Sequence, residues 1–245
     1  MKVIEAFWET RNLSKKTFEI QIDKNDVFEN FLKTEENIIK EKGEYIVVKI
    51  PTSQAAWTHR MFEQGYAFAE TCFELTIKRA TSHVPKYIER MDRNIEIRQV
   101  QDQVHIGYIL KEIMKGLFDT DRISLDPNFS LTQAAIRYAN WTKDMLAKGD
   151  ALFEATISNK PFGFFTLTRL DQKTAYPTLM SCYHEYKNKG LGILLTKKCH
   201  ETVWNLGYEQ INTSVVSNNY DVLKCNLLLG AQIDSMHYTY IKHVR

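Results

Sequence analysis

An internal repeat constrains the fold of this chain more than any other feature of its sequence. When the chain is shifted by 165 residues, Ile46–Pro51 falls into register with Ile211–Val216. Each segment is followed by a helical stretch, by a glycine (Gly65 in the first copy, Gly230 in the second) and by a long run in which apolar and polar residues alternate. A glycine often ends a helix, and alternation with a period of two is typical of a strand. The sequence therefore predicts two copies of a strand–helix–strand unit.

The segment after the first copy, Arg79–Lys86, is polar and contains a proline, which is typical of a linker. We therefore predict an N-terminal domain over residues 1–92, linker included, and a second domain over residues 93–245. In the second domain the pattern predicts, in chain order, a strand over Ile95–Val100, a helix from about Asp102 to Met114, strands over Ala151–Ser158, Gly163–Leu170 and Thr178–Tyr183, a glycine-containing loop, a helix that ends at Gly207, and the second copy of the repeat. This order is typical of an α/β layered domain with a mixed sheet.

The charges and cysteines of the chain exclude several classes of protein. With 32 Lys and Arg against 30 Asp and Glu, the net charge of +2 provides no electrostatic footprint for nucleic acid. The four cysteines lack the spacing of metal ligands, so we expect reduced thiols and no metal site. Glu5 and Glu9 occupy the region where a secretion signal would be apolar, and nowhere do 18 apolar residues follow one another. The sequence predicts a soluble, cytoplasmic protein without membrane insertion.

A glycine-containing loop between a strand and a helix is the clearest chemical motif. It has the pattern Lys187-x-x-Gly190-x-Gly192. Glycines let backbone N–H groups converge, and the N-terminus of the following helix adds partial positive charge, so such a loop can bind a phosphate. Its spacing differs from that of a P-loop and from the dinucleotide-binding fingerprint. The same pattern also fits a plain strand-to-helix turn with solvated lysines.

The wider segment Tyr183–Ile193 resembles the acyl-CoA pyrophosphate loop of the GNAT N-acetyltransferases. Further on, Asn219 and Gly230 resemble the two ends of the second motif of that family, and the two motifs stand in the family's order. The resemblance covers about Asn94 to Arg245. It implies the GNAT fold, which is a mixed, largely antiparallel sheet flanked by helices, preceded here by a truncated GNAT-like half-domain. It also implies an acetyl-CoA-dependent N-acetyltransferase.

In that family the strand before the loop is splayed from its neighbour, so that its backbone can pair with the pantetheine arm of acetyl-CoA. The loop amides bind the pyrophosphate. For this chain the resemblance assigns cofactor binding to the end of that strand, the loop and the start of the second motif: Ser181, Cys182, Lys187, Asn188, Lys189, Gly190, Leu191, Gly192, Ile193 and Asn219.

The catalytic tyrosine of the family, which can protonate the departing CoA thiolate, aligns with Asn226. Asparagine can donate a hydrogen bond to a thiolate but has no proton to give up at neutral pH. A stabilised thiolate can also leave and be reprotonated by water, because the pKa of a free thiol is about 8.5. We therefore expect either that Asn226 is a donor to the thiolate or that Tyr183 or Tyr238 is a replacement acid. Weak or absent activity is the third expectation.

A narrower and more distant resemblance, to the dTDP-fucosamine acetyltransferases, spans nearly the whole chain. It is carried by the N-terminal half-repeat, by Thr120–Pro127 and by Arg137–Trp141. It implies that the acceptor is the amino group of a dTDP-linked 4-amino-dideoxy sugar destined for surface polysaccharide. Arg122, Tyr138 and Trp141 are the candidate acceptor residues, because arginine suits a diphosphate and aromatic rings suit a base or sugar face. Packing of the two aromatic residues into a helix face is the equal alternative.

Three further residues could carry chemistry but have plainer explanations. Glu154 could relay a proton, although strand alternation predicts that it faces solvent. His184 could serve as a base at the loop entrance, although a surface histidine is the plainer interpretation. Cys225 is best explained as a core thiol, because direct attack by an amine needs no enzyme nucleophile.

Two other functions remain open at this stage. One is acylation of a different amine, such as a peptide, an antibiotic or an amino acid, and the other is CoA binding without catalysis. The N-terminal copy of the repeat lacks the glycine loop, so we predict that this half binds no CoA and either extends the sheet or shapes the acceptor side. An exposed strand edge there could pair with a second copy in a homodimer.

Overall fold

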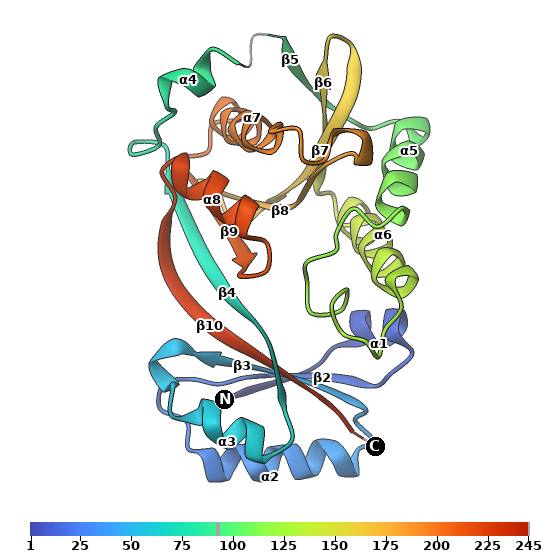
Figure 1. Ribbon diagram of the computed structural model, residues 1–245, viewed down its shortest axis with the longest axis vertical. Helices are drawn as coiled ribbons and strands as arrows, with labels where there is room; N and C mark the ends of the chain where they lie inside the picture. Colours follow the sequence, from blue (N-terminus) through green and yellow to red (C-terminus); the bar gives the residue numbers. More distant parts are fainter. Residues whose placement is uncertain (92–93, 245) are drawn as a thin grey trace. The chain divides into compact units, whose positions relative to one another are not determined.

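The computed structural model describes residues 1–91 and 94–244 and is built from strands and helices throughout (Figure 1). In chain order the elements are β1 (Lys2–Glu5), α1 (Phe7–Leu13), β2 (Thr17–Gln21), α2 (Phe28–Lys40), β3 (Tyr45–Pro51), η1 (Thr52–Gln54), α3 (Trp57–Glu63), β4 (Ala67–Lys78), α4 (Lys86–Glu89), β5 (Ile95–Gln99), α5 (Gln103–Met114), α6 (Leu131–Ala147), β6 (Ala151–Ile157), β7 (Lys160–Arg169), β8 (Thr174–Cys182), η2 (His184–Tyr186), α7 (Gly192–Asn205), β9 (Gln210–Val216), α8 (Tyr220–Leu228) and β10 (Gln232–His243). No helix of the described part is long and apolar enough to cross a membrane.

The chain divides into two compact units, Met1–Phe73 together with Ser235–Arg245, and Glu74–Asp234. The division cuts through β4 and β10, so each of these strands contributes to both units. The predicted boundary between residues 92 and 93 lies outside the described residues, and the assignment of residues 1–92 and 93–245 to two domains stays a prediction.

The internal repeat is confirmed element by element. The bounds of β3 and β4 recur 165 residues later as those of β9 and β10, and α3 and α8 end at equivalent positions. Both helices end in the same way. Gly65 and Gly230 have φ angles of 78° and 93°, a left-handed conformation that suits glycine. Their N–H groups donate to the equivalent carbonyls of Phe62 and Leu227, at 2.9 and 3.1 Å.

The last strand of each copy ends beside the first strand of the other copy. In the first unit β10 runs antiparallel to β3, and the Val244 N–H donates to the Glu44 carbonyl at 2.9 Å. In the second unit the equivalent bond joins the Arg79 N–H to the Glu209 carbonyl, also at 2.9 Å. Each copy therefore completes the sheet of the other.

The first unit is a five-stranded sheet in the order β1-β2-β3-β10-β4. Helices α2 and α3 cover one face and form a core with it. Aromatic rings dominate this core: the Trp57 ring lies 5.0 Å from that of Phe28 and 6.0 Å from that of Phe31. The repeat did not predict this core completely, because α2 contributes to the core but lies before the first copy of the repeat.

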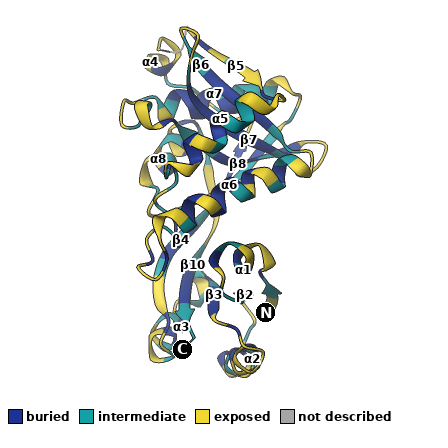
Figure 2. Cartoon of the chain, turned by 90° about the vertical axis from the view of Figure 1, so that its right-hand side faces the viewer, coloured by how far each residue is buried: buried dark blue, intermediate teal, exposed yellow. Residues whose placement is uncertain are grey.

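The second unit has the strand order β4-β9-β8-β7-β6-β5, with helices on both faces. Alternate side chains of β7 lie on opposite faces of the sheet. Phe165 packs in the core on the α7 side, and Phe164 packs in the core on the α5 and α6 side. Figure 2 shows the buried residues gathered along β7, β8 and the inner face of α7. The expected mixed, largely antiparallel sheet flanked by helices is confirmed.

Three local features add to the sequence analysis. Strand β8 begins at Thr174, before Pro177, because a register shift between Phe165 and Leu167 on β7 accommodates the proline. Helix α6 was not predicted, although its capping box at Ser130 and Gln133 is visible in the sequence. The expected linker Arg79–Lys86 lies within the second unit, where a Cβ on Gly230 would be 3.1 Å from the Thr81 carbonyl oxygen.

Candidate active site

The parallel strands β8 and β9 separate soon after they meet. Their backbones pair only at Thr174 with Gln210 and at Ala175 with Ile211, although both strands are described in full. Beyond that point side chains span the gap: the Thr213 hydroxyl donates to the Pro177 carbonyl at 3.1 Å. The remainder of β8 thus offers backbone groups along its β9 side, which is the splayed geometry that the family resemblance implied.

The loop after β8 ends in a helix N-terminus that no side chain of the described residues caps. Asn188 and Gly190 have φ angles of 60° and 73°, and these left-handed residues turn the chain before α7 begins at Gly192. The first N–H groups of a helix have no partner inside it and carry the positive end of its dipole. The first bond across this N-terminus is donated by Leu195 to Leu191. The loop therefore has the geometry of an anion site.

Two lysines add positive charge to this loop. The Lys187 ammonium lies 3.3 Å from a carboxylate oxygen of Asp119, so part of its charge is balanced within the protein. The Lys189 ammonium lies 5.5 Å from the centre of the Tyr186 ring. Both side chains are flexible and at least partly exposed, so they can reorient toward a phosphate.

Ser181 and Cys182 form the end of β8, opposite Phe164 and Gly163 of β7. A Cβ on Gly163 would lie 2.8 Å from the Ser181 carbonyl oxygen, so the close approach of the two strands requires glycine. Burial raises the pKa of the Cys182 thiol to about 12. The thiol is protonated at neutral pH and is therefore unsuited to act as a nucleophile.

With this geometry established, the chain can be compared with known proteins. No protein-family model and no curated protein matches its sequence. Among solved structures it is similar to a GCN5-related N-acetyltransferase from Sphaerobacter thermophilus, with a TM-score of 0.66 and 11% identity over 100% of this chain and 76% of that one. The chain has the GNAT fold.

Two further structures are similar in the same way. A tandem GNAT protein from the clavulanic acid biosynthesis pathway gives a TM-score of 0.57 at 11% identity, over 93% of this chain and 75% of that one. A glucosamine N-acetyltransferase region within a fungal multi-domain GH3 β-N-acetylglucosaminidase gives 0.65 at 10% identity, over 93% of this chain and 30% of that one. At these identities the likeness establishes the fold alone.

Asn226, which the sequence resemblance aligns with the catalytic tyrosine of GNAT enzymes, faces the interior. Its side chain is buried, its amide donates to the Val222 carbonyl at 2.9 Å, and it is hydrogen-bonded to the His200 ring. Burial lowers the pKa of His200 to about 4, so this partner is neutral at pH 7. Asn219 begins the same helix, but its side chain makes no capping bond within the described residues.

The two tyrosines proposed as replacement acids lie in different units. Tyr183 directly follows β8, is buried, and donates its hydroxyl proton to Glu154 at 2.8 Å. Burial, and then the Glu154 carboxylate, raise the pKa of Tyr183. Tyr238 lies on β10 in the first unit, where its ring is 6.3 Å from that of Phe68. Of the two, Tyr183 belongs to the unit that contains the loop and directly precedes it in the chain.

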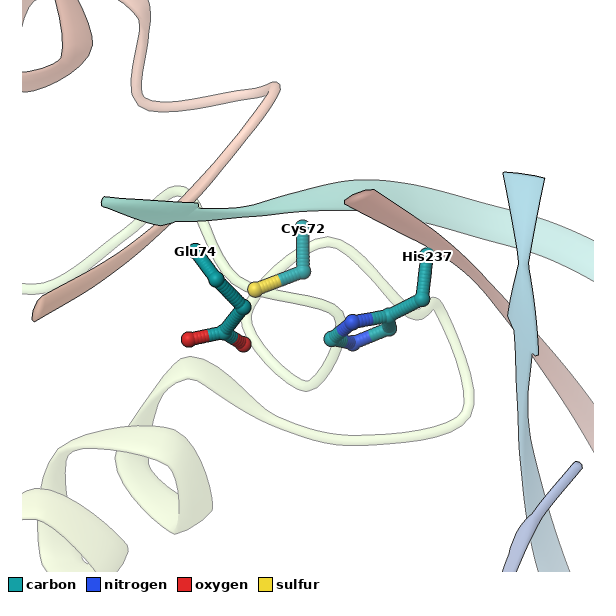
Figure 3. Close-up of side chains that lie close together, drawn as sticks. All are labelled: Cys72, Glu74 and His237. Atoms are coloured by element: carbon teal, nitrogen blue, oxygen red, sulfur yellow. The ribbon is translucent and has the colours of Figure 1, made fainter. Parts of the chain in front are cut away.

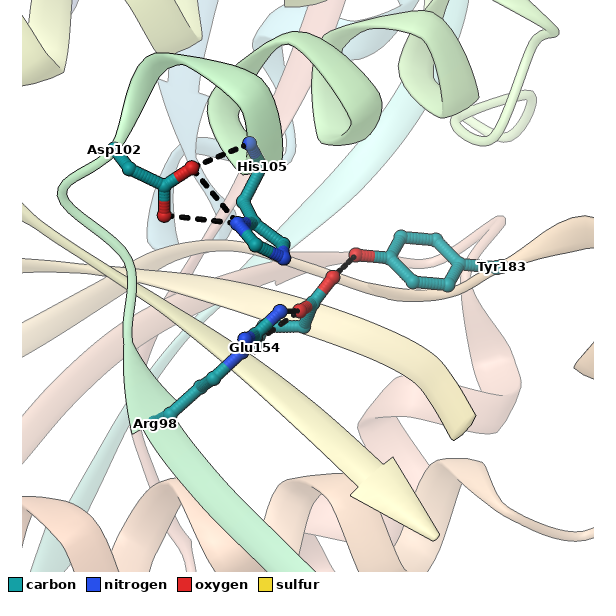
Figure 4. A network of polar contacts seen from close by, with 5 residues as sticks. All are labelled: Arg98, Asp102, His105, Glu154 and Tyr183. Atoms are coloured by element: carbon teal, nitrogen blue, oxygen red, sulfur yellow. Dashed lines mark hydrogen bonds and ion pairs between the residues drawn. The ribbon is translucent and has the colours of Figure 1, made fainter. Parts of the chain in front are cut away.

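The expectation that Glu154 faces solvent is wrong: its exposure is 0%. Figure 4 shows Arg98 and Tyr183 approaching its carboxylate from opposite sides, with the Arg98 Nε at 3.0 Å. Asp102 and His105, in the same view, form the N-cap of α5, where the Asp102 carboxylate accepts the His105 N–H at 3.0 Å. Because α5 covers this face of the sheet, the polar position of the alternating strand is enclosed as well. Arg98 could have indicated that Glu154 is buried in an ion pair, because Arg98 lies opposite Glu154 in the β5–β6 pair.

The candidate acceptor residues have different environments. Tyr138 is buried, stacks on Phe118 at 4.4 Å and donates its hydroxyl proton to Asp121. Trp141 is 38% exposed, with its ring 6.0 Å from that of Tyr138. Arg122 is partly buried beside Asp121, which organises this segment by accepting the N–H of Ile123 at 2.6 Å. Trp141 and Arg122 retain exposed surface, whereas Tyr138 is part of the core.

His184 is exposed, and a nitrogen of its ring lies 2.9 Å from the Lys115 carbonyl oxygen, so it fastens the loop to the end of α5. In the first unit, Cys72 Sγ and a ring nitrogen of His237 lie within 4.8 Å of each other (Figure 3). Burial, and then the charge of Lys49, lower the pKa of His237 to about 4, which leaves its ring neutral. Glu74, the third residue drawn in Figure 3, offers a carboxylate oxygen within the same 4.8 Å and is the first residue of the second unit.

Proposed function

We propose that this protein is an acetyl-CoA-dependent N-acetyltransferase. The observation that carries the proposal is the separation of β8 from β9 directly before an uncapped helix N-terminus in a lysine-bearing loop. An elongated ligand with amide groups at one end and a diphosphate at the other matches this arrangement, and the pantetheine and pyrophosphate of CoA have that form. The GNAT fold supports the same assignment.

In this proposal acetyl-CoA lies along β8 and across the loop. The backbone of Ser181 and Cys182 would pair with the pantetheine arm and polarise the thioester carbonyl. The backbone N–H groups of residues 188–193 would hold the pyrophosphate, with Lys187 and Lys189 supplying full charges. Asn219 would face the pantetheine from the start of α8. Acetyl-CoA supplies the activated acyl group.

The transfer itself needs little covalent help from the protein. The neutral amine of the acceptor attacks the thioester carbon, a C–N bond forms, the C–S bond breaks, and the proton lost from nitrogen passes to solvent. The protein contributes by holding the two reactants in the correct orientation.

The departing thiolate is reprotonated by solvent in this proposal. The Asn226 amide is bonded to Val222, and the Tyr183 hydroxyl is bonded to Glu154. Tyr183 would have to give up its bond to Glu154 in order to donate its hydroxyl proton to the sulfur, and the Asn226 amide has no proton to transfer at neutral pH. Since the pKa of a thiol is about 8.5, a stabilised thiolate is an adequate leaving group without a dedicated acid.

For the acceptor we propose an amino sugar linked to a nucleotide diphosphate, of the dTDP-4-amino-dideoxyhexose kind. The sequence resemblance supports this class, and one of the similar structures is described as a glucosamine N-acetyltransferase region. Arg122 would meet the diphosphate, and Trp141 offers an exposed ring face for the sugar or base. Tyr138 would support Trp141 from beneath.

A thiol-release assay tests the proposal. Acetyl-CoA is offered with a panel of dTDP- and UDP-linked amino sugars, and then with peptides, aminoglycosides and amino acids. We expect rapid CoA release with one nucleotide sugar. Release with a different amine would keep the activity and overturn the acceptor, and failure to bind CoA would overturn the whole proposal.

A second candidate is a protein that binds CoA without transferring the acyl group. The burial and internal bonds of Asn226 favour it, because they leave the position of the family's acid without a group aimed at solvent. Tight CoA binding by calorimetry, together with no release above the hydrolysis rate for any amine, would select this candidate.

A further inference from the structure

We propose that Glu154 and Arg98 act through the Tyr183 hydroxyl as positioning residues, which hold the junction between β8 and the loop in the geometry that binds acyl-CoA. This inference rests on the proposed function for its ligand, but the positioning itself can be tested without one.

Tyr183 is the residue at which the chain leaves the sheet. Its N–H donates to the Phe162 carbonyl at 2.8 Å, which is the last bond to β7 before the loop. Its carbonyl accepts the N–H of Tyr186 at 2.8 Å, which closes the turn η2. The backbone of one residue thus joins strand and loop, and any rotation of Tyr183 would redirect the residues that follow.

The side chain of Tyr183 is fixed on the α5 side of the sheet. Its ring stacks on Phe164 at 6.2 Å and meets the edge of Tyr108 at 5.3 Å and 85°. Its hydroxyl donates to one oxygen of Glu154 at 2.8 Å, and the other oxygen accepts from two nitrogens of Arg98. The Glu154 carboxylate has no exposed surface, so each of these donors is needed to compensate its desolvation.

The network connects three strands of the sheet. Arg98 lies on β5, opposite Glu154 on β6, and Tyr183 follows β8. The hydroxyl bond therefore ties the loop to strands that have no backbone contact with it. Because the bond is buried and its acceptor is charged, it is stronger than an ordinary neutral one.

The side chain of Tyr186 also packs against the sheet, with its ring 6.1 Å from that of Phe162, but the other polar contacts described for the loop side chains are exposed. His184 meets the Lys115 carbonyl, and Lys187 meets Asp119. Exposed ion pairs contribute little to stability. Among the polar contacts described for this region, the Tyr183–Glu154 bond is therefore the one whose loss should change the geometry of the loop most.

The test uses Tyr183→Phe, which removes only the hydroxyl. We expect faster hydrogen–deuterium exchange over residues 184–192 of the unliganded protein, with a dissociation constant for CoA raised roughly tenfold. The KM for acetyl-CoA should rise by a similar factor while kcat changes little. Glu154→Gln can still accept the hydroxyl proton and should restore most of the affinity that Glu154→Ala loses. In the Tyr183→Phe background, Glu154→Gln should have no further effect on CoA affinity.

Tyr66→Phe is the matched control in the first unit. Tyr66 is also buried, burial and the neighbouring Glu35 raise its pKa, and Lys242 bonds to Glu35 at 2.7 Å. This variant removes a buried hydroxyl far from the loop in sequence and should change neither loop exchange nor CoA affinity.

A lower melting temperature for Tyr183→Phe with unchanged loop exchange and unchanged CoA affinity would show that the network is only structural and overturn the inference. If Tyr183→Phe does not fold, the comparison of Glu154→Gln with Glu154→Ala decides by the same two readouts. If the unaltered protein binds no CoA, the proposed function fails, and the exchange data alone then decide whether Tyr183 positions the loop.

Discussion

The two units contain parallel strand pairs of the same kind that differ in one respect. In the first unit, β2 and β3 pair at five positions, from Thr17 with Tyr45 to Gln21 with Lys49, and the Ile22 N–H still donates to Lys49 at 2.9 Å. In the second unit, β8 and β9 pair at only two positions, at one end. A closed ladder leaves no backbone group for a ligand, whereas an interrupted one offers a row of them. The surface that we propose for acetyl-CoA lies where the pairing of β8 with β9 stops.

The segments that follow β2 and β8 differ in charge as well. After β2 come Asp23 and Asp26, and Asp26 accepts both the Asp23 N–H and the N-terminal ammonium before α2 begins. After β8 come two lysines and an uncapped helix N-terminus. Carboxylates at the start of α2 would repel a pyrophosphate, while the lysines before α7 would attract it. This contrast supports the prediction that the N-terminal half binds no CoA.

The largest expected effect is loss of CoA binding in Gly190→Trp. Gly190 has a positive φ and open space around it, so the indole would occupy the volume in front of the α7 N-terminus. Calorimetry should detect no CoA binding. Gly65→Trp is the control, because Gly65 has a similar φ and open surroundings in the first unit. Both variants should lose about 1–2 kcal/mol of unfolding free energy. If the two variants bound CoA equally well, the loop before α7 would not be the CoA site and the contrast between the two units would be refuted.

The next effect concerns acid stability and compares one buried histidine in each unit. His200 has a pKa of about 4, below the ordinary value of 6.5, so the unfolded chain binds the extra proton first as pH falls. The unfolding free energy should therefore drop between pH 6.5 and 4, by up to about 3 kcal/mol from His200. His200→Gln should flatten the profile measured by urea unfolding. His237→Gln should flatten it by a similar amount, because burial and then the charge of Lys49 lower the pKa of His237 to about 4 as well, and an unchanged profile in either variant would contradict the assignment.

Gly163→Ala should lower the unfolding free energy by about 1–3 kcal/mol. The added methyl would meet the Ser181 carbonyl oxygen at 2.8 Å and a Leu195 methyl at 3.0 Å, which forces β7 away from β8. Gly107→Ala is the matched control, because its Cβ meets nothing within 4 Å and alanine favours the helix by about 1 kcal/mol. Urea midpoints that move in the same direction for both variants would show that the β7–β8 approach is not tight.

Lys187→Ala should have the smallest effect, a rise of about threefold to tenfold in the dissociation constant for CoA that shrinks as salt increases. The lysine adds charge to a site whose main contacts are backbone N–H groups. Lys173→Ala removes a comparable exposed ion pair, 3.1 Å from Glu209, and should leave CoA affinity unchanged. A salt-independent loss in Lys187→Ala would indicate a structural role through Asp119 instead.

Features set by local sequence were predictable. The glycines that end α3 and α8 and the loop before α7 each follow from residues within one or two turns of chain, and the repeat follows from comparing two segments of the sequence with each other. Helix α6 could also have been found, because a capping box is a local signal. The splay of β8 from β9 came only from the family resemblance, since no residue pattern within either strand encodes it.

The orientation of Glu154 shows the limit of such reasoning. Alternation states correctly that Glu154 and Phe153 point to opposite faces of β6, but not that helices cover both faces. A polar residue on an alternating strand faces solvent only where no other element covers that face of the sheet. The same limit applies to Asn226, whose motif position gave no indication that its amide would bond to Val222 within the helix.

The sequence by itself determined the duplication, the helix ends, the glycine-bearing loop and its positive charge, because these depend on backbone conformation and composition over short distances. The tertiary structure alone decided that β2 pairs with β3 along its whole length while β8 and β9 pair only at one end. It also decided that the last strand of each copy lies beside the first strand of the other copy, and that Glu154 is buried in contact with Arg98 and Tyr183. Those outcomes depend on which segments distant in the chain become neighbours, and the free energy of burying them is a property of the assembled layers.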